Sequence, residues 1–253
     1  MTDPAASSEA PPRFEGALFM PAYPPAKFGR WEVVIGGVGF APGYWSGPTI
    51  VSGMPALLRD GETWMSISPL EIESEEIGIR AALGHVVILG LGLGWAAAAT
   101  ACVPAVTRVT VVERDPEVIA LHQALNVFSQ LEPEAKAKLN IVQDDAFDYR
   151  PSQPVDLMIP DIWQPLVGGD RVAEVRQMQS NVHAGAVYFW GQELEIARHA
   201  AAAGHPCDDE GVAATAAAFG LPLVGPGTPG YAGKVAAAAE RWMRGRWLTG
   251  PEG

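Results

Sequence analysis

A chain of 253 residues is long enough to bury a substantial core, as one large domain or as a domain with a small appendage. Hydrophobic residues make up 48% and charged residues 18%, which is typical of a globular protein and not of a disordered one. The formal net charge of −12 repels phosphate backbones and argues against nucleic acid as a partner. Two cysteines are too few for a disulfide framework, and residues 1–15 read as a disordered tail without a secretion signal, so we expect a cytoplasmic protein.

Residues 16–70 are expected to form a small β-rich element. Its stretches of alternating polarity or β-branched residues are 31–37, 49–53 and 56–67. Asp60-Gly61 is a strong signal for a two-residue hairpin turn, because both residue types adopt the positive φ angles that such turns require. A helix is expected next, over residues 69–83.

Residues 71–253 are expected to form an α/β domain, in which short apolar strands alternate with helices. This alternation is what a parallel sheet with both faces covered requires. The expected strands are 85–90, 108–113, 139–143, 155–160 and 186–190. The expected helices are 95–102, 115–128, 170–182, 192–203, 208–219 and 232–247. The pattern predicts a doubly wound, mostly parallel, Rossmann-like sheet with a helical C-terminus.

The uncharged run over residues 81–107 is long enough to be considered as a transmembrane helix. Several glycines and Pro104 interrupt it, and β-branched residues gather in its first third. A strand, a glycine turn and a helix explain the same residues, so no membrane partner is expected.

Polar residues follow three successive strands of the expected sheet. The first strand ends in the loop Gly90-Leu91-Gly92-Leu93-Gly94, which leads into a helix and allows a ligand to approach the backbone closely. The second ends at Glu113, followed by Arg114; a carboxylate there can accept hydrogen bonds from both hydroxyls of a ribose. Asp144, Asp145 and Ala146 follow the third, where a carboxylate and a backbone N–H can bind adenine. We therefore predict an adenosine held across three strand ends.

The motifs VVILGLGLG, VTVVERDPEVI, NIVQDDAFDY and VDLMIPDIW together resemble the class I S-adenosylmethionine-dependent methyltransferases, over about residues 71–192. The resemblance implies S-adenosylmethionine as the cofactor and methyl transfer to a nitrogen or oxygen of a small molecule or peptide. The cofactor-binding residues that we expect are Gly90, Gly92, Gly94, Glu113, Arg114, Asp144, Asp145 and Ala146.

The acceptor side is expected after the fourth strand, where Asp161 would face the cofactor cleft with Trp163 beside it. A carboxylate there can orient an acceptor and take its proton, and an aromatic wall stabilises cationic character. Asp161 is therefore the expected catalytic residue, and Trp163 and Trp64 are expected to contact the substrate. The segment DIWQPL is also similar to a motif of guanidino-type N-methyltransferases, which makes Glu73 a candidate for binding a cationic substrate. No compact zinc signature is present, so no metal is expected.

Other functions stay open. The hairpin segment LLRDGETW is similar to the N-terminal hairpin of polyamine synthases such as spermidine synthase, which transfer an aminopropyl group from decarboxylated S-adenosylmethionine. Trp64 replaces their glutamine, however, and no second aspartate follows Asp161 closely. Gly92-x-Gly94-x-x-Ala97 also fits a dinucleotide fingerprint, which keeps an NAD-dependent oxidoreductase open. A cofactor-binding protein without catalysis is a further alternative. Little strand signal follows Trp190, so we expect either a shortened sheet or C-terminal helices that replace the family's terminal hairpin as a lid or a homodimer surface.

Overall fold

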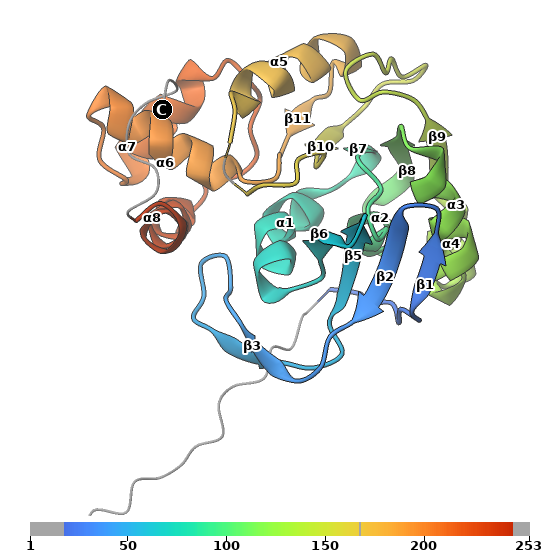
Figure 1. The fold of residues 1–253 in the computed structure, drawn as a ribbon. Helices are drawn as coiled ribbons and strands as arrows, with labels where there is room; N and C mark the ends of the chain where they lie inside the picture. Colours follow the sequence, from blue (N-terminus) through green and yellow to red (C-terminus); the bar gives the residue numbers. More distant parts are fainter. Residues whose placement is uncertain (1–17, 167, 245–253) are drawn as a thin grey trace, which may run out of the picture.

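The computed structural model describes residues 18–166 and 168–244, so the tail predicted at 1–15 lies outside the described residues. Its centre is a sheet in the order β11-β10-β7-β8-β9, with every strand pair parallel (Figure 1). The strands are β7 (Gly84–Leu89), β8 (Val106–Glu113), β9 (Leu139–Gln143), β10 (Leu157–Pro160) and β11 (Ala186–Val187). After β7, the chain adds β8 and β9 on one side of this strand and then β10 and β11 on the other, so the strand order reverses between β7 and β10. In such sheets the carboxyl ends of these two strands border a ligand-binding crevice.

Helices cover both faces of this sheet, which confirms the doubly wound architecture. Val86 and Ile88 of β7 belong to one hydrophobic cluster, whereas Val87 and Leu89 belong to another. The first cluster includes side chains from α1 (Pro69–Ala81), α2 (Trp95–Ala101), α3 (Pro116–Leu125) and α4 (Pro133–Ala137). The second includes side chains from α5 (Arg171–Val182), α6 (Gln192–Ala203), α7 (Asp209–Ala218) and α8 (Tyr231–Trp242). Near-continuous apolar strands were therefore the correct signal for a sheet buried on both sides.

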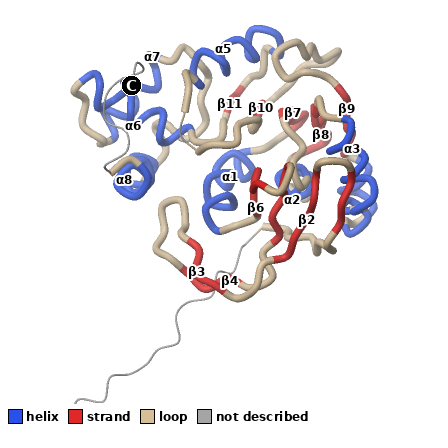
Figure 2. Tube along the Cα trace, viewed as in Figure 1, coloured by secondary structure: helices blue, strands red, loops and turns tan. Residues whose placement is uncertain are grey.

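The β-rich N-terminal region is also present (Figure 2). An antiparallel sheet contains β1 (Ala26–Phe28), β2 (Trp31–Ile35), β5 (Pro55–Arg59) and β6 (Glu62–Ser66). A separate hairpin contains β3 (Gly39–Ala41) and β4 (Thr49–Val51). Asp60 and Gly61 join β5 to β6 with φ angles of 54° and 85°, so both have the positive φ that the hairpin turn was expected to need.

Local capping explains where the helices next to the crevice begin. Asp115 Oδ1 accepts a hydrogen bond of 2.9 Å from the backbone N of Glu117, and Pro116 occupies the first turn of α3. Ser68 caps α1 in the same way, by accepting from the backbone N of Glu71. Since β6 ends at Ser66 and α1 begins at Pro69, the change in structure falls near residue 70; a domain boundary there stays a prediction.

The last strand of the parallel sheet is shorter than expected. Only Ala186–Val187 of the predicted strand 186–190 pairs as a strand, although the backbone N of Trp190 still donates to Pro160 O at 3.0 Å. Gly191, at a φ of 80°, then caps α6, which begins at Gln192. Leu223 forms a bridge to Val187, and within the described residues no antiparallel strand extends this sheet.

The helical C-terminus is confirmed as far as residue 244, with α6, α7 and α8 gathered on one side of the molecule (Figure 1). The expected helix over 232–247 ends as α8 at Trp242, and its last residues lie outside the described part of the chain. Across the described ranges, no helix combines the length and apolar character needed to cross a bilayer.

Candidate functional site

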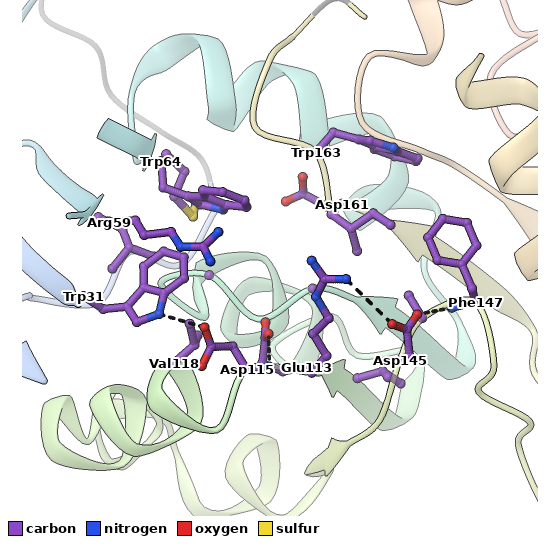
Figure 3. A pocket seen from close by; sticks show the side chains of 18 of the residues that line it. Trp31, Arg59, Trp64, Glu113, Asp115, Val118, Asp145, Phe147, Asp161 and Trp163 are labelled. Carbon is purple, nitrogen blue, oxygen red and sulfur yellow. Dashed lines mark hydrogen bonds and ion pairs between the residues drawn. The ribbon is translucent and has the colours of Figure 1, made fainter. Parts of the chain in front are cut away.

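The carboxyl ends of β7, β8, β9 and β10 border a cavity of about 290 Å³, seen from close by in Figure 3. The N-terminal sheet and α1 complete its wall. The residues predicted from sequence that line it are Gly90, Gly92, Glu113, Arg114, Asp145, Ala146, Asp161, Trp163 and Trp64. Most of the predicted site residues therefore come together around one space.

Glu113 is held in a fixed orientation at the edge of the cavity. Its Oε2 accepts a hydrogen bond of 3.1 Å from the backbone N of Leu91, inside the glycine loop, and its Oε1 accepts one of 2.8 Å from the backbone N of Asp115. Gly90, at a φ of 107°, lies so close to Asp161 that a Cβ would come within 2.0 Å of the Asp161 carbonyl oxygen. Glycine is needed here because the end of β10 packs directly against the loop.

Asp145 marks one end of the cavity, beside Phe147 (Figure 3). Its Oδ1 accepts a hydrogen bond of 2.9 Å from the backbone N of Phe147, and its Oδ2 lies 3.7 Å from Nη1 of Arg114. The arrangement presents a carboxylate, an aromatic ring and the backbone of Ala146 to the same space. This is a suitable set of groups for a flat heterocycle with an exocyclic amine.

Three predicted site residues do not line the cavity. Gly94 caps α2, and a Cβ there would meet the His122 ring at 2.4 Å, so packing explains this glycine. Asp144 is exposed, and its Oδ1 accepts from the backbone N of Asp145 at 2.8 Å. Glu73 is buried, and its Oε2 accepts from the backbone N atoms of Trp45 (2.9 Å) and Ser46 (3.1 Å). Glu73 therefore positions a loop of the N-terminal region.

Asp161 and Trp163 lie together on the opposite side of the cavity from Glu113 (Figure 3). Trp163 Nε1 donates a hydrogen bond of 2.5 Å to Oε2 of Glu174, and the Arg171 guanidinium lies 5.0 Å from the Trp163 ring centroid. These two contacts fix the indole ring as a wall of the cavity. Trp64 lines the cavity from the N-terminal sheet.

Sequence reasoning missed two charged residues of the site. The Arg59 guanidinium lies 5.4 Å from the ring centroids of both Trp31 and Trp64, and all three residues line the cavity. Glu71 of α1 also lines it, whereas the sequence analysis selected Glu73 from the glutamates of this segment. A signal for Glu71 existed: Glu71, Glu75 and Gly78 have the i, i+4, i+7 spacing of one helix face, which is the buried face of α1.

Burial changes the proton affinity of the carboxyl groups on the acceptor side. The pKa of Asp161 is raised to about 7 by burial, against the opposing positive charge of Arg171. Burial, and then the nearby charge of Asp161, raise the pKa of Glu71 well above its usual range. The pKa of Glu75, deeper in α1, is raised by burial and by the charges of Asp161, Glu71 and Glu193. Asp161 is therefore suited to exchange a proton near neutral pH.

No known protein-family pattern and no curated protein matches the chain. Among solved structures, the DhpI-SAM-HEP complex is similar at 24% identity with a TM-score of 0.34, over 46% of this chain and 51% of that one. The glycopeptide N-methyltransferase MtfA, complexed with S-adenosyl-L-homocysteine, is similar at 17% identity with a TM-score of 0.36, over 45% and 44%. Precorrin 8W decarboxylase of Methanobacterium thermoautotrophicum is similar at 19% identity with a TM-score of 0.31, over 42% and 52%. The chain spans about half the length of these proteins.

Proposed function

We propose that this protein binds S-adenosylmethionine in the cavity and transfers its methyl group to a nitrogen or oxygen of a small molecule or peptide. The observation that carries the proposal is the position of Glu113. Its carboxylate stands at the end of β8, bound to the glycine loop on one side and adjacent to the Asp145 end of the cavity on the other. A ribose bound by Glu113 would put an adenine at Asp145 and Ala146, as the sequence predicts.

The residues present fit this cofactor. Each carboxylate oxygen of Glu113 accepts one backbone hydrogen bond, and a carboxylate has about four acceptor positions, so capacity for two ribose hydroxyls is left. Phe147 offers a ring beside the adenine position. The cavity volume of about 290 Å³ is near the lower limit for small-molecule sites.

Arg59 favours S-adenosylmethionine over its decarboxylated form. The two indole rings lie against its guanidinium, and its Nε is buried without a hydrogen-bond partner among the described residues. A guanidinium stacked in this way still has N–H donors at its edge, which suit a carboxylate. We assign Arg59 to the methionine carboxylate, a group that the substrate of an aminopropyltransferase lacks. The aminopropyltransferase alternative is therefore the weaker one.

The acceptor side of the cavity suits proton removal. Bound S-adenosylmethionine would supply an electrophilic methyl group on a sulfonium centre. Asp161 would accept the proton that the attacking nitrogen or oxygen loses, because its pKa near 7 lets it be ionised at neutral pH. Trp163 would exclude water and stabilise positive charge on the acceptor. Small-molecule or peptide acceptors, a homodimer and a cytoplasmic location belong to the same proposal.

The proposal is tested by thermal shift and calorimetry with S-adenosylmethionine, S-adenosylhomocysteine, decarboxylated S-adenosylmethionine and NADH. A ligand at about 100 times its Kd adds roughly 2.7 kcal/mol of stability, a rise of about 5–10 °C in Tm for a chain of this size. Selective stabilisation by the first two ligands supports the proposal. Binding of NADH alone would replace it with an oxidoreductase, and preference for the decarboxylated ligand would replace it with an aminopropyltransferase. Cofactor binding without turnover of any acceptor would leave a cofactor-binding protein without catalysis.

A further inference from the structure

Two carboxyl groups on the acceptor side of the cavity have no hydrogen-bond or ion-pair partner among the described residues. Glu71 is 9% exposed and Asp161 is half-buried, and both line the cavity. Within residues 18–166 and 168–244, neither carboxylate accepts a hydrogen bond or forms an ion pair. Both groups line the same cavity, and burial, followed by the charge of Asp161, raises the pKa of Glu71. A buried pair of this kind is unfavourable unless protons or a cation compensate it.

Both groups are held in place by the fold. The backbone N of Asp161 donates to Leu89 O at 2.8 Å, which continues the pairing of β10 with β7. Glu71 lies in the first turn of α1, where its backbone N donates to the Ser68 side chain. One turn further along α1, Glu75 is 1% exposed, and neither of its carboxylate oxygens has a partner among the described residues. Secondary structure therefore fixes the positions of the carboxyl groups on this side of the cavity.

The cation that acts on Asp161 is already bound to other groups. The Arg171 guanidinium donates to the backbone carbonyl oxygens of Trp190 and Pro165, and it stacks 5.0 Å from the Trp163 ring and 5.1 Å from the Trp190 ring. It moderates the pKa of Asp161 but forms no ion pair with it within the described residues. A cationic ligand could therefore replace the protons that compensate Glu71 and Asp161 in the free protein.

We propose that the methyl acceptor is a primary or secondary amine that enters as its ammonium ion and donates hydrogen bonds to Glu71 and Asp161. An ammonium group supplies both the charge and several N–H donors, which a neutral hydroxyl does not. A metal ion is the weaker occupant, since no group of three or more His, Cys, Asp or Glu side chains in the described ranges is arranged to hold one. The Trp64 and Trp163 rings, which also line the cavity, favour an organic cation.

This inference rests on the proposed function, in which the amine nitrogen attacks the methyl group of the cofactor. The ammonium ion loses one proton to the carboxylate of Asp161. The nitrogen lone pair then forms the N–C bond to the methyl group while the S–C bond breaks and its electron pair stays on sulfur. The sulfonium charge is thereby transferred to the methylated nitrogen, which leaves as an ammonium ion. Glu71, whose ionised form the bound cation stabilises, accepts a hydrogen bond from the remaining N–H group throughout.

The test is calorimetric binding of matched probes to the full chain saturated with S-adenosylhomocysteine. The probes are phenethylamine, 2-phenylethanol and phenylacetate, and the aliphatic pair butylamine and butanol. Each amine should bind about tenfold more tightly than its alcohol, and phenylacetate should not bind. Glu71→Gln should remove this preference for the amine and leave alcohol binding unchanged. Glu76→Gln is the matched control, because Glu76 lies on the same helix but pairs with Arg80 at 2.7 Å.

The inference is overturned if neither amine binds more tightly than its alcohol, or if Glu71→Gln and Glu76→Gln have equal effects. Failure of the proposed function gives a different result. In that case S-adenosylhomocysteine does not bind, and the preference for amines over alcohols is measured on the ligand-free protein. A preference that persists there supports the acidic site and overturns only the assigned cofactor.

Discussion

The indole Nε1 of Trp31 donates a hydrogen bond of 3.0 Å to Oδ2 of Asp115, which joins the N-terminal sheet to the residue that begins α3. The other oxygen of Asp115 accepts from the backbone N of Glu117, so both oxygens of this carboxylate are in use. Asp115 also donates its backbone N–H to Glu113. The position of the N-terminal sheet and that of the proposed ribose site are thus fixed by one residue.

Trp31→Phe should destabilise the protein by about 1–3 kcal/mol, because it keeps an aromatic ring but leaves a carboxylate oxygen without its donor. Urea unfolding at pH 7 measures the change. Trp64→Phe is the matched control, since the Nε1 of Trp64 makes no hydrogen bond within the described residues, and it should cost less stability than Trp31→Phe. Equal losses in the two variants would mean that the Trp31–Asp115 contact adds nothing.

Replacement of Glu113 should weaken cofactor binding. Loss of hydrogen bonds to a charged group costs roughly 1.5–3 kcal/mol, so Glu113→Ala should raise the Kd of S-adenosylhomocysteine by about 10- to 100-fold in calorimetry. The Kd should stay unchanged in Glu134→Ala, whose side chain is exposed on α4. If Glu113→Ala binds the ligand normally, the ribose does not lie at the end of β8.

Asp161→Asn should spare cofactor binding and reduce turnover. Because burial raises the pKa of Asp161 to about 7, the base is protonated in acid and ionised in alkali, so kcat/KM should rise with pH through about 7. The variant should lose both most of kcat and this rising limb. A pH–rate profile that keeps the limb in Asp161→Asn would assign proton removal to another group.

The choice between S-adenosylmethionine and its decarboxylated form should depend on Arg59. Arg59→Met should raise the Kd of S-adenosylmethionine by about tenfold, because it removes a charge-assisted hydrogen bond to the methionine carboxylate. The Kd of the decarboxylated ligand should hardly change. Arg30→Met, in the turn between β1 and β2, is the control, since Arg30 pairs with Asp60 at 3.2 Å on the surface. Parallel losses for both ligands would show that Arg59 only shapes the cavity.

The stability of the fold should fall as pH rises, in part through Glu193. This side chain is 0% exposed, and burial raises its pKa to about 7, from a usual value of 4.5, although hydrogen bonds from tyrosine hydroxyls oppose the shift. The folded state therefore binds the proton more tightly than the unfolded state. The stability that this gives is complete below about pH 4.5 and is lost as pH rises through about 7, which corresponds to roughly 3 kcal/mol.

Glu193→Gln isolates this contribution. Urea unfolding at pH 5.0 and pH 7.5 should show a smaller pH-dependent loss in the variant than in the parent protein, because the glutamine has no proton to release. Glu210→Gln, exposed on α7, should behave like the parent. An unchanged pH dependence in Glu193→Gln would show that Glu193 does not titrate in this range.

Local signals predicted much of the fold. Asp60-Gly61 and Asp115-Pro116 carry their own conformational preferences, and both are found where they were expected, at a hairpin and at a helix start. Glu113 and Asp145 were predicted to lie together because parallel strands end at a common edge, and both line the cavity. This prediction depended only on which strands are neighbours in the sheet, and not on how distant segments pack.

The residues that were missed depend on contacts between distant segments. Arg59 and Glu71 line the cavity because the N-terminal sheet and α1 close over the strand ends, which brings together segments that are distant in the sequence. Glu73 was expected at the substrate, yet it holds the backbone N–H groups of Trp45 and Ser46, which lie 28 and 27 residues away. Glu71, Glu73 and Glu75 of one helix therefore have different surroundings: Glu71 lines the cavity, Glu73 binds a loop, and Glu75 is buried without a hydrogen-bond partner among the described residues.

The hydrogen bond from Leu91 to Glu113 has a kinetic consequence. It gives the glycine loop its shape before any cofactor arrives, so association requires little ordering of the backbone. Capture of the cofactor should then be a single fast step whose rate varies little among variants, and differences in affinity should reside in the lifetime of the complex. The dissociation rate of the cofactor, and not its association rate, would then determine whether an acceptor binds before the cofactor leaves.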